Sequence, residues 1–166
     1  MKKLVPLFLL AFLCNLAFGQ EPRKGYVLKF GEGEVIDEEN LFILLATPES
    51  GTQGSVFVYD AMPKGSTSGL HYHLTADEFF YVLEGRGTVQ IGTENHTIEP
   101  HDMIFVPVGT DHKITSSVDD PLRVIFILDR PGFDEQVRLH LDRSKMTLEE
   151  FNAIVEQHGT IYKSFE

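Results

Sequence analysis

The chain has 166 residues and a formal net charge of −11, with 25 acidic against 14 basic side chains. This length allows one domain with a substantial core, because single domains of about 100 to 200 residues bury most of their apolar surface. The acidic surplus argues against nucleic acid and anionic membranes as partners. A single cysteine excludes an intramolecular disulfide framework, so packing alone must hold the fold.

The first residues have the features of a secretion signal. MKKLVPLFLLAFLCNLAFGQ combines Lys2 and Lys3 with an apolar run over 4–13 and a small-residue cleavage pattern. We predict a signal peptide at 1–19 and a secreted or periplasmic mature chain that forms a single domain over 20–166. The alternative is an uncleaved anchor, but the apolar run is shorter than the roughly 20 residues that a spanning helix needs. After cleavage we expect no stable membrane insertion.

Short β-favouring runs occupy most of the remaining chain. In chain order they are YVLKF (26–30), LFILLAT (41–47), SVFVYDA (55–61), EFFYVLEG (78–85), GTVQIG (87–92), MIFVPV (103–108), HKITSS (112–117) and LRVIFIL (122–128). Turn residues separate them, as in the stretch 92–95. Many short strands without helices between them predict an antiparallel sandwich or barrel.

The pattern changes after Pro131. TLEEFNAIVEQHG begins with Thr147, has Glu150 at the capping-box position, repeats apolar residues at helical spacing and ends at Gly159. We predict an amphipathic helix over about 147–158. Its apolar face is expected to cover the barrel or a partner subunit, and a functional lid is the alternative.

Polar side chains interrupt one strand-like stretch, GLHYHLTADEFFYVLEG. His71 and His73 are two residues apart and therefore share one face of a strand. If the strand that begins at Glu78 pairs back antiparallel, its carboxylate reaches the same point. Neutral imidazole and carboxylate are ligands that divalent transition metals accept. An isolated His-x-His pair is also common as surface decoration, but His112 supplies a further imidazole from a distant hairpin.

With these residues the chain resembles the cupin family. The first cupin motif, G-x5-H-x-H-x4-E-x6-G, is matched at every fixed position, by Gly65, His71, His73, Glu78 and Gly85. The second motif, G-x5-P-x-G-x2-H-x3-N, is matched by three residues, while its first glycine and last asparagine are replaced: the matches are Pro107, Gly109 and His112, and the departures are His101 and Ser116. Histidine adopts positive φ more readily than most residues, so His101 is compatible with the turn.

The resemblance implies an all-β fold, a jelly-roll (cupin) β-barrel with a short C-terminal α-helical extension. It also implies one divalent transition metal ion (Fe, Mn, Ni, Co, Cu or Zn), held by His71, His73, Glu78 and His112. A bound cation would explain why polar side chains occupy the interior, where unpaired polar groups are costly.

Several other side chains are candidates for a ligand pocket or for the core: Phe57, Tyr59, Phe80, Val82, Phe105 and Phe126. We expect most of them in the core, because inward side chains fill small barrels. Tyr59 carries a hydroxyl that would be able to meet a substrate. His101 is interpreted as a turn residue rather than a partner of the site, and His96 and Asp111 as solvent-facing.

Among cupins the chain looks like small quercetin 2,3-dioxygenase-like proteins. The resemblance implies a dioxygenase-type oxidoreductase acting on a small phenolic or enolisable compound, with Glu78 as metal ligand and catalytic base. A metal-assisted isomerase or lyase acting on a sugar or sugar acid, and a non-catalytic metal- or ligand-binding cupin, are the alternatives. The expected partners are a small-molecule substrate or ligand and a second copy of the chain, paired through the edge strand 26–30.

Overall fold

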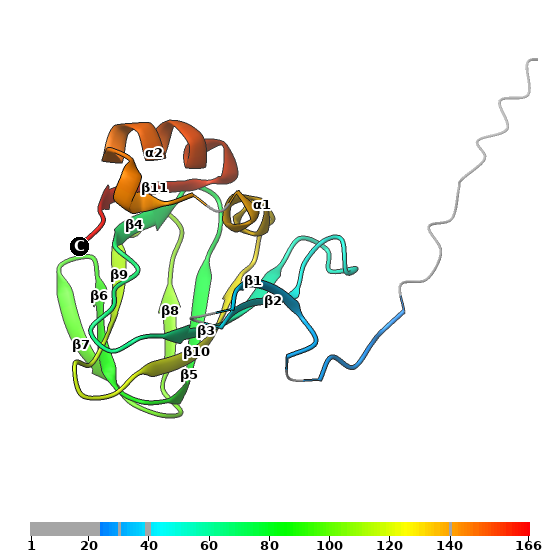
Figure 1. Ribbon diagram of the computed structural model, residues 1–166, viewed down its shortest axis with the longest axis horizontal. Helices are drawn as coiled ribbons and strands as arrows, with labels where there is room; N and C mark the ends of the chain where they lie inside the picture. Colours follow the sequence, from blue (N-terminus) through cyan, green and yellow to red (C-terminus); the bar gives the residue numbers. More distant parts are fainter. Residues whose placement is uncertain (1–23, 30, 39–40, 140) are drawn as a thin grey trace, which may run out of the picture.

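Two antiparallel β-sheets lie face to face in the computed structural model, which describes residues 24–29, 31–38, 41–139 and 141–166 (Figure 1). The larger sheet has the strand order β1 (Glu34–Asp37), β2 (Phe42–Ala46), β3 (Val56–Met62), β10 (Leu122–Leu128), β5 (Glu78–Glu84) and β8 (Met103–Val106). The smaller sheet has the order β11 (Thr160–Ser164), β4 (Leu70–His73), β9 (His112–Ser116), β6 (Gly87–Ile91) and β7 (Glu94–Ile98). The predicted all-β jelly-roll is confirmed.

The core lies between the two sheets and follows from alternation along each strand. In β10 every second residue from Leu122 to Leu128 is buried, and this strand pairs on one side with β3 and on the other with β5. Valines of the larger sheet, such as Val58 and Val82, meet Val89 and Ile114 of the smaller sheet in one apolar cluster. The inward-pointing side chains, which recur at every second position of each strand, therefore fill the interior of the sandwich.

Gly85 shows why the first motif needs its closing glycine. The residue follows β5 with φ of +80°, and a Cβ at this position would collide with the carbonyl of Pro121. A side chain would thus have to adopt a strained backbone and displace the neighbouring turn. The motif glycine fixes how β5 leaves the sheet that carries Glu78.

The C-terminal part covers the end of the sandwich where β4 lies (Figure 1). It contains α1 (Phe133–Arg138), the 3₁₀ turn η1 (Arg143–Lys145), α2 (Leu148–Val155) and the 3₁₀ turn η2 (Glu156–His158), followed by β11. Thr147 and Glu150 form the predicted capping box, and Gly159 ends the segment with φ of +88°. The predicted helix is therefore confirmed, although its last turn tightens into η2.

The apolar face of α2 packs onto the sandwich, as predicted. Phe151 and Val155 form a buried cluster with Tyr162 of β11. Because β11 pairs antiparallel with β4, this cluster is joined directly to the strand that carries two of the motif histidines.

Three strands, β1, β7 and β11, were not predicted from the sequence. Residues 26–29 form no strand, and Tyr26 and Val27 are exposed; the edge strand is instead the acidic β1, which pairs with β2. The predicted turn 92–95 is shorter, because Ile91 pairs with Glu94 and β7 begins there. β1 and β7 carry few buried side chains, so the apolar alternation used for prediction is weak in both strands. The third, β11, pairs with β4.

The predicted signal peptide lies outside the described residues. Within the described ranges, no helix combines the length and apolar character needed to cross a membrane. The division of the chain into a leader and one domain over 20–166 stays a prediction.

Candidate metal centre

The four predicted ligand residues come together inside the sandwich. His71 and His73 point inward from β4, Glu78 is the first residue of β5, and His112 is the first residue of β9. His71 lies opposite His112 in the pairing of β4 with β9. All four residues are at least 95% buried.

Their ligand atoms lie close enough to share one ion. One atom from each residue can be chosen so that all four lie within 4.8 Å of one another. Oε2 of Glu78 is 2.7 Å from Nε2 of His112 and 3.3 Å from Nε2 of His73. The predicted convergence of the four side chains is therefore confirmed. The predicted pairing of their strands is wrong: β4 belongs to the smaller sheet and β5 to the larger one, so Glu78 meets the histidines across the interior of the sandwich.

The other ring nitrogen of each histidine is held by the protein. Nδ1 of His71 lies 2.9 Å from the carbonyl of Gly69, and Nδ1 of His112 lies 3.0 Å from the carbonyl of Thr110. Because a carbonyl only accepts, both Nδ1 atoms donate, and in the neutral rings Nε2 carries a lone pair. Nδ1 of His73 lies 3.2 Å from Oγ1 of Thr160 on β11. Such contacts orient metal-binding imidazoles.

The atoms that face the centre have no hydrogen-bond partner within the described part of the chain. They are Nε2 of His73, Nε2 of His112 and Oε2 of Glu78. Two lone-pair atoms 2.7 Å apart, as in His112 and Glu78, repel each other unless a proton or a cation lies between them. The donor set, two imidazole nitrogens and a carboxylate oxygen with His71 beside them, therefore fits a divalent transition metal.

Electrostatics at the cluster also favour a cation. Burial would raise the pKa of Glu78, but its interactions with the imidazoles of His73 and His112 outweigh burial and hold that pKa below its usual range. Burial and the neighbouring charges of His112 and His73 lower the pKa of His71 to about 3. For His112, burial acts to lower the pKa, but the carboxylate of Glu78 raises it overall. A metal ion bound between Nε2 of His112 and Oε2 of Glu78 would take the place of a proton there.

The sequence matches a known family over this region. The family model described as "Cupin domain" matches residues 58–128, the segment that contains all four residues of the cluster. This chain is a cupin. The two cupin motifs thus account for the buried polar cluster, which is typical of the metal site of this family.

Named relatives cover the same region. MJ1618, an uncharacterized protein of Methanocaldococcus jannaschii, is 38% identical over 64 residues, which are 39% of this cupin and 51% of that protein. This cupin therefore spans about half the length of that relative. The oxalate-binding protein of Thermotoga maritima is 26% identical over 101 residues, which are 61% of this chain and 80% of that protein.

A solved structure supports the fold. KdgF from Halomonas sp. superposes with a TM-score of 0.56 at 19% identity, covering 67% of this chain and 99% of that chain. At this identity the likeness shows the shared fold, and the chemistry must come from the site itself.

The two departures from the second motif have structural explanations. His101 has φ of +78°, so a histidine adopts the conformation in which the motif has glycine, and its Nδ1 is 3.1 Å from the hydroxyl of Tyr81. Ser116 is buried and accepts a hydrogen bond from the amide of Ser66 at 3.1 Å. Its hydroxyl donates to the carbonyl of Pro63. Both residues organise turns, as predicted for His101.

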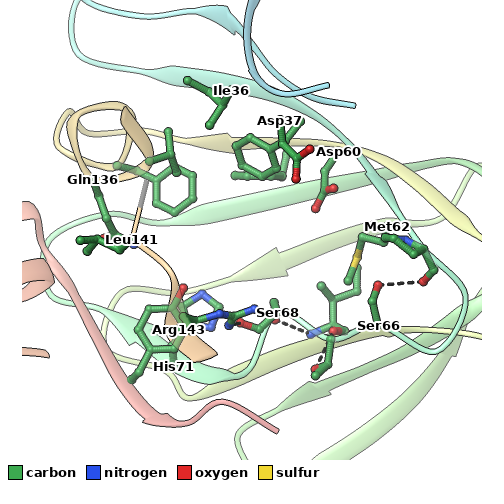
Figure 2. Close-up of a pocket in the computed structure, with 18 of the residues that line it drawn as sticks. Ile36, Asp37, Asp60, Met62, Ser66, Ser68, His71, Gln136, Leu141 and Arg143 are labelled. Carbon is green, nitrogen blue, oxygen red and sulfur yellow. Dashed lines mark hydrogen bonds between the residues drawn. The ribbon is translucent and has the colours of Figure 1, made fainter. Parts of the chain in front are cut away.

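A cavity of about 840 Å³ opens onto the metal-ligand cluster (Figure 2). His71 and Glu78 lie on its wall. The apolar part of the wall is rich in phenylalanine: Phe42, Phe80, Phe126, Phe133 and Phe151. A second part is polar, with Asp37, Asp60, Ser66, Thr67, Ser68, Gln136, Arg143 and Tyr162.

The predicted pocket residues separate into different places. Phe80 and Phe126 belong to the core and line the cavity, and Val82 is in the core. Phe57 and Tyr59 are wrong as candidates for this cavity, because they alternate with the inward Val58 and line a different hollow. Phe105 is 49% exposed. His96 is exposed as predicted, whereas Asp111 is half-buried and pairs with Lys163.

Two functional candidates escaped the sequence analysis. Tyr162 is the buried tyrosine of this cavity, and its ring stacks on that of His71 with centroids 4.9 Å apart. Asp60 points into the cavity from β3 near Asp37 (Figure 2), and burial followed by the charge of Asp37 raises its pKa to about 7. An acidic residue at the inward parity of Val56 and Val58 was the signal that would have identified Asp60.

Proposed function

We propose that this cupin is a metal-dependent oxidoreductase of the dioxygenase type that acts on a small phenolic or enolisable compound. The observation that carries the proposal is the phenylalanine-rich cavity that opens directly onto the metal-ligand cluster. Bound there, a divalent transition metal would keep coordination positions open and make a coordinated hydroxyl more acidic. The aromatic wall would hold the flat, apolar part of the substrate.

Within this proposal, Glu78 is both metal ligand and catalytic base. Its carboxylate lies on the cavity wall, and its lowered pKa keeps it ionised at neutral pH. Because a lowered pKa also makes this carboxylate a weak base, it would take a proton only from a substrate hydroxyl that the bound cation has made more acidic, leaving that oxygen negatively charged and the carboxyl neutral. His71, His73 and His112 would hold the ion, and the contacts at their Nδ1 atoms would fix the direction of each ring.

The polar part of the cavity favours a second candidate, a metal-assisted isomerase or lyase acting on a sugar or sugar acid. Asp37, Asp60 and Ser66 offer several hydrogen-bonding groups that a polyhydroxylated substrate would use. A non-catalytic ligand-binding role is the third candidate. Its support is the likeness to the oxalate-binding protein of Thermotoga maritima.

Oxygen dependence separates these candidates. The full chain, with its metal content measured, is incubated with flavonols, diketones and catechols in an oxygen electrode, and in parallel with sugars and sugar acids under nitrogen. Oxygen uptake matched by loss of the phenolic or diketone compound is the expected result. Product formation from sugars without oxygen would instead establish the second candidate, and tight binding without any product would establish the third.

Export and dimerisation stay proposals that rest on sequence. The basic and apolar leader supports export, and cell fractionation with sequencing of the mature N-terminus tests it. For a homodimer, the predicted strand over 26–30 is no longer available as the pairing edge, because residues 26–29 form no strand. The remaining edges are β1 and β8 in the larger sheet and β11 and β7 in the smaller sheet.

A further inference from the structure

One wall of the cavity comes from the C-terminal extension, defined here as residues 133–165. The cavity is lined by Gln136 of α1, Arg143 of η1 and Tyr162 of β11, and also by His71 on β4, the strand that pairs with β11. The extension lies outside the segment 58–128 that matches the cupin family model. These three side chains are therefore additions to the part of the chain that builds the metal-ligand cluster.

Tyr162 connects the extension to the cluster. Its ring stacks on that of His71 at an interplanar angle of 15°. The Cζ atom of Arg143 lies 5.9 Å from the centre of the same ring. Polar groups of the extension thus surround the approach to a proposed metal ligand.

Arg143 brings a positive charge without a carboxylate partner. Nη1 of Arg143 donates to the carbonyl of Ser68 at 2.7 Å, and no ion pair of this residue occurs among the described residues. The other arginines in the described ranges each pair with at least one carboxylate: Arg86, Arg123, Arg130 and Arg138. In an acidic chain with a net charge of −11, a guanidinium left unpaired at a cavity wall favours an incoming carboxylate.

Gln136 adds an independent sign of a missing ligand. This side chain is 94% buried, it lines the cavity, and its Oε1 atom has no hydrogen-bond partner in the described ranges. Buried amide oxygens are rarely left without a donor, because the lost hydration is not replaced. A hydroxyl group of a bound ligand would supply that donor.

We propose that the extension recognises a hydroxy acid with an apolar, preferably aromatic, body. The carboxylate pairs with the guanidinium of Arg143, and a hydroxyl other than the one that meets the cation donates to Oε1 of Gln136. The apolar body lies against Phe126 and Phe133. This inference rests on the proposed function in placing the ligand in the cavity beside the metal-ligand cluster. It narrows the substrate class from phenolic or enolisable compounds to those that carry a carboxylate.

Calorimetric titration of the full chain under nitrogen tests the inference without turnover. The probes are salicylate, which has both groups, benzoate, which lacks the hydroxyl, and phenol, which lacks the carboxylate. Salicylate is expected to bind about tenfold more tightly than either, since each probe omits one directional contact. Equal affinity for the three probes, or no binding of salicylate, would overturn the inference.

Variants assign the two contacts. Arg143→Gln is expected to weaken salicylate and benzoate about tenfold and leave phenol unchanged, whereas Gln136→Leu removes the advantage of salicylate over benzoate. Arg86→Gln, at an exposed arginine paired with Glu99, is the matched control and should bind like the wild type. Unchanged salicylate affinity in Arg143→Gln, or an equal loss in Arg86→Gln, contradicts the proposed contact.

A measurement on the unaltered chain guards against a folding defect in the Arg143 variant. Added potassium chloride should weaken the binding of salicylate and leave that of phenol unchanged, because only the former forms an ion pair. Salt-independent salicylate binding would refute the pairing. If salicylate binding is salt-sensitive but no oxygen is taken up, the dioxygenase proposal is rejected and this inference stands. If oxygen is taken up with catechol but carboxylates are not preferred, this inference is rejected and the dioxygenase proposal stands.

Discussion

The segment 58–128 and the C-terminal extension both contribute walls to the same cavity, and they differ in how the sequence encodes them. In the first segment, fixed spacing places four metal-ligating side chains on β4, β5 and β9. In the extension, Gln136, Arg143 and Tyr162 come from three separate elements without any short motif. The comparison teaches that a metal site can be found by spacing, whereas the residues that face a substrate depend on how distant elements fold over it.

Removing a metal-ligating side chain should have the largest effect, and that effect should be confined to the metal-ligand cluster of the segment 58–128. Glu78→Ala or His112→Ala is expected to lower the metal content of the purified protein to roughly a tenth of the wild-type value, because the variant lacks one of four donors and leaves its partners unpaired. Plasma mass spectrometry of protein purified in parallel gives the ratio. His96→Ala, at an exposed histidine on β7, is the control. Equal metal content in all variants would mean that the ion, if any, binds elsewhere.

Truncating the core of the extension should destabilise the protein while preserving the ligands. Phe151 is buried against Tyr162 with ring centroids 5.2 Å apart. Phe151→Ala is expected to lower the free energy of unfolding by about 3 kcal/mol, the usual cost of such a cavity. Denaturant unfolding followed by circular dichroism measures it. If stability is unchanged, the extension does not pack as a cooperative part of the fold.

The smallest effect is expected at Asp60. This half-buried acidic residue lies in the segment 58–128 but is not one of the four metal-ligating residues, so a bound metal ion does not explain its burial. Its pKa of about 7 lies above the ordinary value, so the folded state binds a proton that the unfolded state has already lost, and stability falls as pH rises from about 4 to 7. Asp60→Asn should therefore raise the free energy of unfolding at pH 8. The shift of about three pKa units corresponds to at most about 4 kcal/mol, and because Asp60 is partly exposed we expect a gain on the order of 2 kcal/mol.

Chemical denaturation at pH 4 and pH 8 checks this pH dependence. The gain from Asp60→Asn should be nearly absent at pH 4, where the carboxyl is protonated in the folded protein and half-protonated when unfolded. Lys64→Gln, on the loop that follows the same strand, serves as a control for a general effect of charge. A gain of the same size at both pH values would show that burial of Asp60 does not set its protonation.

Sequence reasoning reached the fold and the metal-ligand cluster because both leave local patterns. The buried face of β10 is a strict alternation, and His71, His73 and Glu78 are fixed by spacing within two consecutive strands, β4 and β5, although these strands belong to different sheets and do not pair as predicted. Such patterns survive without any knowledge of distant contacts.

The remaining features depend on tertiary contacts that no local pattern contains. β1 is an acidic edge strand whose pairing with β2 overrides a weak propensity, while the more apolar stretch 26–29 finds no partner strand. Tyr59 and Tyr162 are similar in sequence context, and only the register of β11 on β4 places Tyr162 opposite His71. The short run after Gly159, TIYKS, is β-favouring and was the available signal for that strand.

The hydrogen bond between Thr160 and His73 joins residues that are 87 positions apart in the chain. Contacts at such separation carry a large loop-closure entropy, so we expect this one to form late in folding. The direction of the His73 imidazole thus depends on a contact far more distant in the sequence than the spacing that joins His71, His73 and Glu78. The orientation of all three imidazoles is complete only once β11 pairs with β4, and a partly folded chain that contains β4 and β5 without β11 would lack the contact that holds His73.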